Sequence, residues 1–131
     1  MPDSRRARIE ELMEAFNERR FEEYVAGFHD DAVVDYPQSG ERVRGRENLL
    51  GMFTAFAAPP TFRTWRIDTD GDTVLVHAVG DYPGLDPLFV LIEYRFNGDR
   101  IAQETAYFGS AFAPADWRKP FVEVRPYSTE R

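Results

Sequence analysis

Apolar residues recur at helical spacing in the first third of the chain. A first helix is predicted over residues 5–20, with Ser4 as its cap and an apolar face made by Ile9, Leu12, Met13 and Phe16. The same spacing is repeated by Phe21, Tyr24, Val25 and Phe28. A short strand at 32–36 and a hairpin with its turn at 38–41 and its return at 42–44 follow. A third helix is predicted between Gly45 and Pro59, so we expect about three helices before residue 60.

The second half alternates apolar and polar residues as antiparallel strands do. Strands are predicted over residues 62–67, 73–82, 88–96 and 100–108, and Asn97-Gly98 is the clearest turn between them. The Pro- and Gly-containing connection 82–87 is expected to border a pocket mouth. Residues 111–131 are interpreted as a strapped-down tail that is disordered after about Tyr127.

Helices followed by hairpins predict an α+β fold with the helices on one side of the sheet. If the sheet is strongly curved, it can form a cone-shaped α+β barrel that holds a pocket against the helices. The 131 residues have the length of one domain, which we expect to be ordered over residues 5–125.

Composition narrows the possible partners. The formal net charge of −7 disfavours nucleic acid, because an acidic protein repels a phosphate backbone. The absence of cysteine excludes disulfides, thiolate nucleophiles and cysteine-based metal sites. No apolar run approaches the roughly 20 residues of a membrane span, and no apolar signal core follows the start. We therefore expect a cytoplasmic protein that binds no membrane.

Several short sequence motifs make the fold assignment more specific. They are Asn17, Phe28-His29-Asp30-Asp31-Ala32-Val33, Pro37-Gln38-Ser39-Gly40-Glu41-Arg42, Arg44-Gly45-Arg46-Glu47-Asn48 and Phe96-Asn97-Gly98-Asp99-Arg100-Ile101. Over residues 5–125 the chain resembles the SnoaL-like, nuclear-transport-factor-two-like superfamily. It is most similar to a subgroup, without an agreed reaction, that combines the Pro-Gln-Ser-Gly-Glu-Arg loop with residues 104–108 and a tail containing Trp117.

The resemblance implies a fold that serves isomerases, cyclases, dehydratases, epoxide hydrolases and non-catalytic binding proteins, so the fold leaves the reaction open. Where ketosteroid isomerases keep their aspartate base and oxyanion pair, this chain has Tyr36, Leu12 and Ile92, none of which can do that work. The aspartate–arginine–aspartate pattern of the epoxide hydrolases has no counterpart either. Ketosteroid isomerase activity is therefore not expected.

Glu104 is the most informative acidic residue. Strand alternation groups it with Ala102, Ala106 and Phe108 on a small, apolar face, although Ile101 falls on the opposite face. Enclosure would raise the pKa of its carboxyl and suit it to proton transfer near neutral pH. The alternative is a structural carboxylate bonded to a tyrosine or arginine.

His77 is the second acid/base candidate. Alternation groups it with Leu75, Val79 and Asp81, and the alignment of motifs implied by the resemblance turns that face toward the pocket. Asp81 could then fix the tautomer of the imidazole. The alternative is a histidine satisfied within the sheet or in a dimer interface. No histidine pair has metal-ligand spacing, so we expect no metal site.

The remaining pocket positions are predicted as substrate contacts. Tyr36 and Tyr94 are expected to orient a substrate oxygen, although either could be a core tyrosine with one hydrogen-bond partner. The other positions expected to line the pocket are Leu12, Phe16, Met52, Val79, Ile92 and Ala106.

These residues favour a lyase, isomerase or cyclase that moves a proton beside a carbonyl or hydroxyl of a small apolar or aromatic molecule, without a cofactor. A non-catalytic binding or sensing domain with the same pocket is the alternative. We also expect a homodimer through the outer sheet face, because Phe89, Leu91, Gln103, Thr105 and Tyr107 point away from the pocket.

Overall fold

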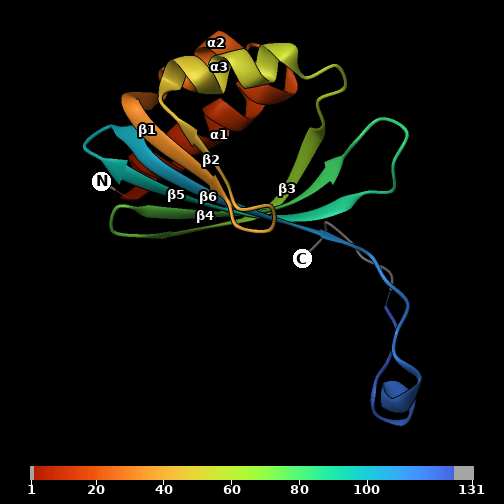
Figure 1. Ribbon diagram of the computed structural model, residues 1–131. Coiled ribbons are helices and arrows are strands. Elements are labelled where there is room, and N and C mark those ends of the chain that lie inside the picture. The colour runs from red at the N-terminus through yellow and green to blue at the C-terminus, as the bar shows by residue number, and fades with distance from the viewer. Residues whose placement is uncertain (1, 126–131) are drawn as a thin grey trace.

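The computed structural model describes residues 2–125, and its elements follow the predicted order (Figure 1). The helices are α1 (Pro2–Asn17), α2 (Phe21–Ala26) and α3 (Arg46–Ala55), and a 3₁₀ helix, η1, spans Asp116–Phe121. The strands are β1 (Phe28–Tyr36), β2 (Glu41–Arg44), β3 (Thr61–Asp70), β4 (Thr73–Asp81), β5 (Leu88–Asn97) and β6 (Arg100–Ser110). Ser4 lies inside α1 instead of capping it, because the helix begins two residues earlier.

The six strands form one curved sheet in the order β2-β1-β6-β5-β4-β3. All neighbours are antiparallel except β1 and β6, which run parallel. The three N-terminal helices lie together over one face of this sheet, here named the inner face (Figure 1). The predicted α+β cone with a mostly antiparallel sheet is thus confirmed. No helix in the described part of the chain is long and apolar enough to cross a bilayer.

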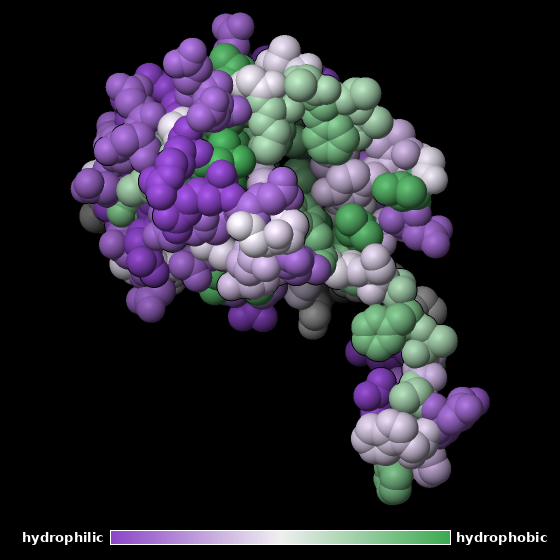
Figure 2. All heavy atoms as spheres, in the orientation of Figure 1, coloured by the Kyte–Doolittle hydropathy of each residue, from purple (hydrophilic) through white to green (hydrophobic). Residues whose placement is uncertain are grey.

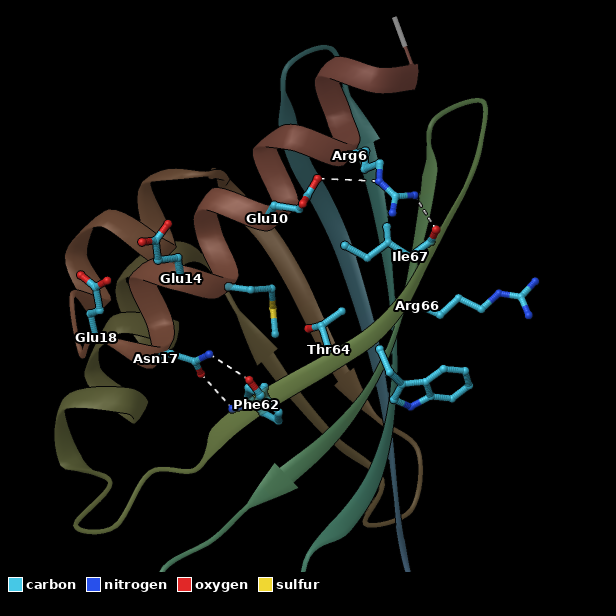
Figure 3. Close-up of a pocket in the computed structure, with 11 residues that line it drawn as sticks. Arg6, Glu10, Glu14, Asn17, Glu18, Phe62, Thr64, Arg66 and Ile67 are labelled. Carbon is cyan, nitrogen blue, oxygen red and sulfur yellow. Dashed lines mark hydrogen bonds and ion pairs between the residues drawn. The ribbon is translucent and has the colours of Figure 1, made fainter. Parts of the chain in front are cut away.

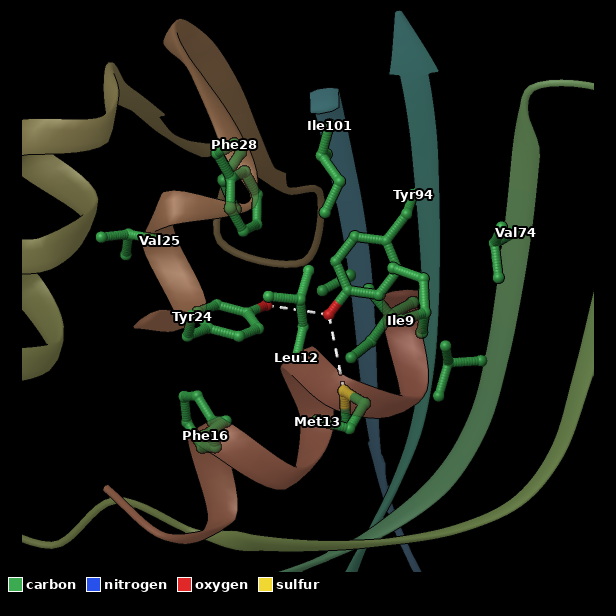
Figure 4. Packing of buried hydrophobic residues seen from close by; sticks show 14 of the residues in the cluster. Ile9, Leu12, Met13, Phe16, Tyr24, Val25, Phe28, Val74, Tyr94 and Ile101 are labelled. Atoms are coloured by element: carbon green, nitrogen blue, oxygen red, sulfur yellow. Dashed lines mark hydrogen bonds between the residues drawn. The ribbon is translucent and has the colours of Figure 1, made fainter. Parts of the chain in front are cut away.

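The core fills the space between the inner face and α1 and α2 (Figure 4). Its fully buried side chains include Ile9, Leu12, Phe28, Val74, Val76, Tyr94 and Ile101. Phe28, predicted to continue the second helix, instead begins β1, because the chain turns at Gly27. A Cβ atom at Gly27 would lie 2.5 Å from Cδ1 of Leu12, so a larger residue at this close passage over α1 would force the buried Leu12 to shift.

A β-bulge in β6 sets the orientation of Glu104. Arg95 pairs with Gln103 but Phe96 pairs with Ile101, which leaves Ala102 as an extra residue in the ladder. Simple alternation would put Ile101 and Glu104 on opposite faces, yet both are buried on the inner face. The bulge therefore resolves the conflict that the sequence pattern left open.

Side chains of α1 and the turn after it hold the edge strand β3 against the helix (Figure 3). The Asn17 amide donates to the carbonyl oxygen of Phe62 at 2.9 Å and accepts from its N–H at 2.8 Å. Arg6 donates to the carbonyl oxygen of Ile67 at 2.7 Å, and Arg19 donates to that of Pro60 at 2.7 Å. These contacts fix the side of the cone on which α1 meets the sheet.

Residues 111–125 do not form the strapped-down tail predicted from the sequence. They leave the end of β6 and project from the body as an arm, visible in blue in Figure 1. The aromatic side chains that were expected to hold the tail down are exposed, with Phe112 and Phe121 each at 83% and Trp117 at 74%. The disorder predicted after Tyr127 lies outside the described residues.

Candidate functional site

A cavity of about 690 Å³ lies between the inner face of the sheet and the helices, within the range usual for small-molecule sites. Aromatic rings dominate its walls, among them Phe16, Phe53, Phe62 and Phe108. The space-filling view shows the body hollowed between apolar residues (Figure 2). The walls are therefore suited to an apolar or aromatic molecule.

Glu104 is the one buried charged residue of the described chain, with 4% of its surface exposed. Strand register brings it between Val34 of β1 and Tyr94 of β5, in the middle of the inner face. Of the described residues that line the cavity, only Glu41 and Glu104 carry a charge, and both are acidic. No lysine or arginine from this part of the chain neutralises the carboxylate inside the cavity.

A chain of hydrogen bonds connects Glu104 to α1 and α2, and Figure 4 shows the part of it that joins Tyr24, Tyr94 and Met13. The hydroxyl of Tyr24 donates to Oε1 of Glu104 at 3.2 Å and lies 2.8 Å from the hydroxyl of Tyr94. The Tyr94 hydroxyl also lies 3.7 Å from the sulfur of Met13. Each hydroxyl has one proton, so an ionised Glu104 orders the chain from Tyr94 through Tyr24 to the carboxylate. A protonated Glu104 can donate to Tyr24 instead, which frees the Tyr94 proton for Met13.

Burial raises the pKa of Glu104 to about 7, because the carboxylate loses its hydration in the apolar wall. The hydrogen bond from Tyr24 acts in the opposite direction and lowers the pKa. Burial and the nearby Glu104 raise the pKa of Tyr24 and of Tyr94 well above 10, so both phenols keep their protons. The raised pKa suits the Glu104 carboxyl to exchange a proton near neutral pH.

Tyr36, at the end of β1, supplies a second polar group to the cavity wall. Its ring packs 6.0 Å from that of Phe108, and within residues 2–125 its hydroxyl has no hydrogen-bond partner. Burial raises its pKa, with a smaller contribution from Glu104. The phenol therefore remains a donor that a bound molecule can accept from.

The structure brings six predicted site residues to this cavity: Phe16, Tyr36, Met52, Ile92, Glu104 and Ala106. Tyr94 does not line it but lies behind Tyr24, to which it is hydrogen bonded. Leu12 does not line it either, because it is buried in the core under Gly27. Val79 is buried outside the core cluster and away from the cavity.

The structure does not place His77 with Glu104. Val74, Val76 and Ala78 face the core, so His77 lies on the opposite, outer face of the sheet. There its Nε2 is 3.2 Å from Oδ2 of Asp68, and its ring centroid is 5.1 Å from that of Trp65. Alternation grouped the residues of β4 correctly, but the inward assignment was wrong, because both faces of this strand are apolar and a shift of one residue inverts them.

Asp81 does not support His77 as predicted. Its Oδ2 accepts from Nε of Arg63 at 2.6 Å, across the β3–β4 pair. The hydrogen bond from Arg63 lowers the pKa of Asp81, which is the mark of an exposed ion pair. This carboxylate belongs to the outer rim of the sheet.

Sequence reasoning missed Tyr24, which links Glu104 to the helices. The residue fitted the apolar spacing of the second helix, and that spacing gave it no role in the site. A phenol on the buried face of a helix needs a hydrogen-bond partner, and this requirement was the available clue. Gln38, Ser39 and Tyr82 also line the cavity, from the β1–β2 turn and the start of the β4–β5 connection. The predicted role of the second connection as a border of the pocket is therefore supported at Tyr82.

The sequence model of the SnoaL-like domain family matches residues 9–104, which run from the second half of α1 to Glu104 in β6. The chain therefore belongs to the SnoaL-like domain family. No curated protein matches the sequence.

Solved structures show the same fold. An NTF2-like protein of unknown function from Burkholderia xenovorans LB400 is 28% identical, with a TM-score of 0.84 over 95% of this chain and 97% of that chain. A structure from Kribbella flavida DSM 17836, provisionally assigned as a ketosteroid isomerase, is 22% identical, with a TM-score of 0.90 over 99% and 96%. An LEH-like epoxide hydrolase from M. tuberculosis is 20% identical, with a TM-score of 0.69 over 82% and 84%.

Proposed function

We propose that the protein is a cofactor-independent enzyme of the isomerase, lyase or cyclase kind, with Glu104 as its general base. The observation that carries this proposal is a single carboxylate, buried in an apolar cavity and without a basic neighbour there. Such a carboxylate costs folding free energy, which proton transfer to a substrate would explain. The membership of isomerases, cyclases and hydrolases in this family is consistent with it.

In the proposed reaction, the Glu104 carboxylate accepts a proton from a carbon atom beside a carbonyl of the substrate. The electron pair of the broken C–H bond moves toward the carbonyl oxygen, which becomes an enolate oxygen. Tyr36 donates a hydrogen bond to that oxygen, since its own hydroxyl has no partner in the described chain. The protonated Glu104 then returns the proton to another atom of the intermediate, which completes an isomerisation, or assists the loss of a leaving group.

Tyr24 and Tyr94 act as positioning residues in this scheme. When Glu104 is ionised, Tyr24 donates to one carboxylate oxygen and Tyr94 donates to Tyr24. The second oxygen of Glu104 is left for the substrate. A change of protonation at Glu104 reverses the direction of the chain without moving a heavy atom.

The substrate that suits this cavity is uncharged and largely apolar. The aromatic walls bury apolar surface, while Glu41 and Glu104 repel carboxylates and phosphates. A ketone with one ring or two fused rings would suit the volume of the cavity and the polar groups of Glu104 and Tyr36.

The non-catalytic alternative uses the same cavity merely to hold such a molecule. Mutual pairing of Tyr24, Tyr94 and Glu104 is the observation that favours it, because a structural network also satisfies buried polar groups.

Deuterium exchange separates the two functions without knowledge of the natural substrate. The protein is incubated in D₂O with a panel of neutral cyclic ketones, and deuterium beside the carbonyl is measured by mass spectrometry. We expect catalysed exchange that Glu104→Gln lowers by about 10²- to 10⁴-fold, the usual contribution of a general base. Glu93→Gln is the matched control, because Glu93 is a partly exposed carboxylate of β5 that pairs with Arg95 and does not line the cavity. Ketone binding without exchange by the wild type would favour the binding function.

We also propose that the chain pairs with a second copy through the outer sheet face. Trp65, Leu91 and Tyr107 on that face support it, because they form an apolar surface that the helices do not cover.

A further inference from the structure

The arm (residues 111–125) carries most of the large apolar side chains that are exposed within residues 2–125. Phe112, Trp117, Phe121, Val122 and Val124 are all exposed, while the rest of the described chain exposes only Phe56, Leu85 and Tyr107 among its large apolar residues. In Figure 2 the arm stands apart from the body with its apolar residues in view. Within the described residues, η1 packs against no other helix or strand. A segment of this composition in water implies a partner surface.

The arm nevertheless has a defined local structure. The η1 helix contains Pro120, which restricts its backbone. The Arg118 guanidinium lies 5.5 Å from the Trp117 ring, and Nζ of Lys119 pairs with Asp116 at 3.0 Å. This order lowers the entropy lost when the arm binds.

The outer face of the sheet offers a groove of about 440 Å³, whose walls include Trp65, His77, Phe89, Leu91 and Tyr107. Register lines up His77, Leu91 and Tyr107 across β4, β5 and β6. Gly109 beside Phe89 leaves the groove floor open, since a Cβ atom there would meet nothing within 4 Å.

Ion pairs lie on the strands to either side of this groove. Arg63 of β3 pairs with Asp81 of β4, and Arg42 of β2 pairs with Asp35 of β1. An apolar centre with a polar rim is the anatomy of a protein–protein interface.

We propose that the arm packs into this groove on a second copy of the chain, so that the two protomers exchange arms. This goes beyond a pair of opposed sheet faces, because the arm supplies part of the interface and Trp117 and Phe121 are its anchors. The apolar arm and the apolar groove are both exposed on the same chain. A two-fold symmetric dimer buries both of them in one interface.

The position of the arm favours a second copy over an unrelated protein. It continues β6, whose residues Tyr107 and Gly109 line the groove, so two opposed outer faces bring the root of each arm beside the groove of its partner. With its extended residues at about 3.3 Å each and the six residues of η1 at about 2 Å each, the arm can reach roughly 40 Å, enough to cross a neighbouring domain of this size. The arm also contains three basic and two acidic residues in a chain whose net charge is −7, so the body it meets is acidic.

Sedimentation equilibrium of the full chain gives the first test. We expect the wild type to be a dimer. The double variant Trp117→Ala and Phe121→Ala should dimerise more weakly, with a dissociation constant at least tenfold higher. The matched control is Glu123→Ala, a polar change in the same arm, which should dimerise as the wild type does. Circular dichroism should show unchanged folding, because both aromatic side chains are exposed. A monomeric wild type, or a double variant that dimerises normally, would overturn the proposal.

Cysteine cross-linking gives the second test, and the chain contains no cysteine of its own. Trp117→Cys on the arm is mixed with Leu91→Cys in the groove, and a short bismaleimide is added. We expect a covalent dimer with one chain of each kind, identified by peptide mass spectrometry. The control mixture pairs Trp117→Cys with Glu11→Cys, an exposed position of α1, and should give little product.

A chain carrying both Trp117→Cys and Leu91→Cys separates exchange from folding back. Cross-links between two chains support the exchange of arms. Cross-links within one chain, in a protein that sediments as a monomer, would mean that each arm covers its own groove, and the proposal would be wrong.

Discussion

The two faces of the sheet are both apolar and aromatic, yet each contains a different acid/base residue in a different setting. On the inner face, helices cover Glu104, whose carboxylate faces a cavity and whose pKa is raised to about 7 by burial. On the outer face, His77 is half-buried and lies beside Asp68. The pKa values of Asp35, Asp68 and Asp81 on that face are lowered, in each case mainly by a hydrogen bond from an arginine.

The difference shows that residue type alone does not make a catalytic site. Histidine is the usual proton carrier at neutral pH, but here the sheet places it on an open surface among ion pairs. A glutamate becomes the better candidate because the helices remove water from it. The two faces therefore differ in whether the helices shield the residue from water, and not in the intrinsic pKa of the residue type.

The largest expected effect compares the two candidates directly. In the deuterium-exchange assay, Glu104→Gln should lower the rate by about two orders of magnitude or more, while His77→Gln should leave it essentially unchanged. The reason is that only Glu104 reaches the cavity. A large loss in the His77 variant, with an intact fold, would contradict the assignment of function to the inner face.

Stability against pH tests the raised pKa of Glu104. Its pKa is about 7 in the folded protein and 4.5 in the unfolded chain, so between these values the folded state keeps a proton that the unfolded chain has released. The free energy of unfolding therefore falls as pH rises from 4.5 to 7, by about 3 kcal/mol in total. Glu104→Gln lacks this loss. Urea unfolding gives the free energy of unfolding of both proteins at each pH. Between pH 4 and pH 8 this free energy should shift in favour of the variant. A difference between the two proteins that stays constant over this range would count against a raised pKa.

Tyr24→Phe tests the contribution of one hydrogen bond to the pKa of Glu104. The variant loses the hydrogen bond that favours the ionised Glu104, so the pKa of this carboxyl should rise further above 7. A hydrogen bond to a charged group contributes about 1.5–3 kcal/mol, which corresponds to a rise of roughly one to two pH units. The ¹³C carboxyl resonance of Glu104 measures it. Tyr107→Phe, which removes a hydroxyl from the outer face, is the control and should leave that resonance unchanged.

The smallest effect is expected on the outer face. His77→Ala removes a partly exposed contact with Asp68, and such pairs contribute less than about 1 kcal/mol. Thermal unfolding at a protein concentration low enough to keep the chain monomeric should therefore show a small change. A loss of several kcal/mol would mean that His77 is a structural residue of the sheet.

Periodicity was sufficient to predict the helices, the hairpins and the order of elements. Turns at Gly71 and Gly98 have positive φ values, which the sequence signals directly through glycine. The orientation of β4 could not be predicted in the same way. Val74 and Val76 on one face and Leu75 and Val79 on the other are equally apolar, so hydrophobicity did not indicate which face the helices cover.

The site was predictable in part for a similar reason. Glu104 was identified because it interrupts an apolar face. The bulge at Ala102 showed in the sequence only as a conflict between the faces of Ile101 and Glu104, which alternation alone could not resolve. The contact between Tyr24 and Glu104 joins residues 80 positions apart. Only the folded sheet and helices bring such residues together, so spacing along the chain could not reveal it.

The hydrogen bonds between α1 and β3 also affect the solubility of the protein. β3 is an edge strand, and unpaired backbone groups on an edge can recruit strands from other molecules into growing aggregates. Here Asn17 occupies both the N–H and the carbonyl of Phe62, and Arg6 occupies the carbonyl of Ile67. A foreign strand would have to displace these side chains before it could add to the sheet. The residues that fix the helix thereby shield the chain from edge-to-edge aggregation.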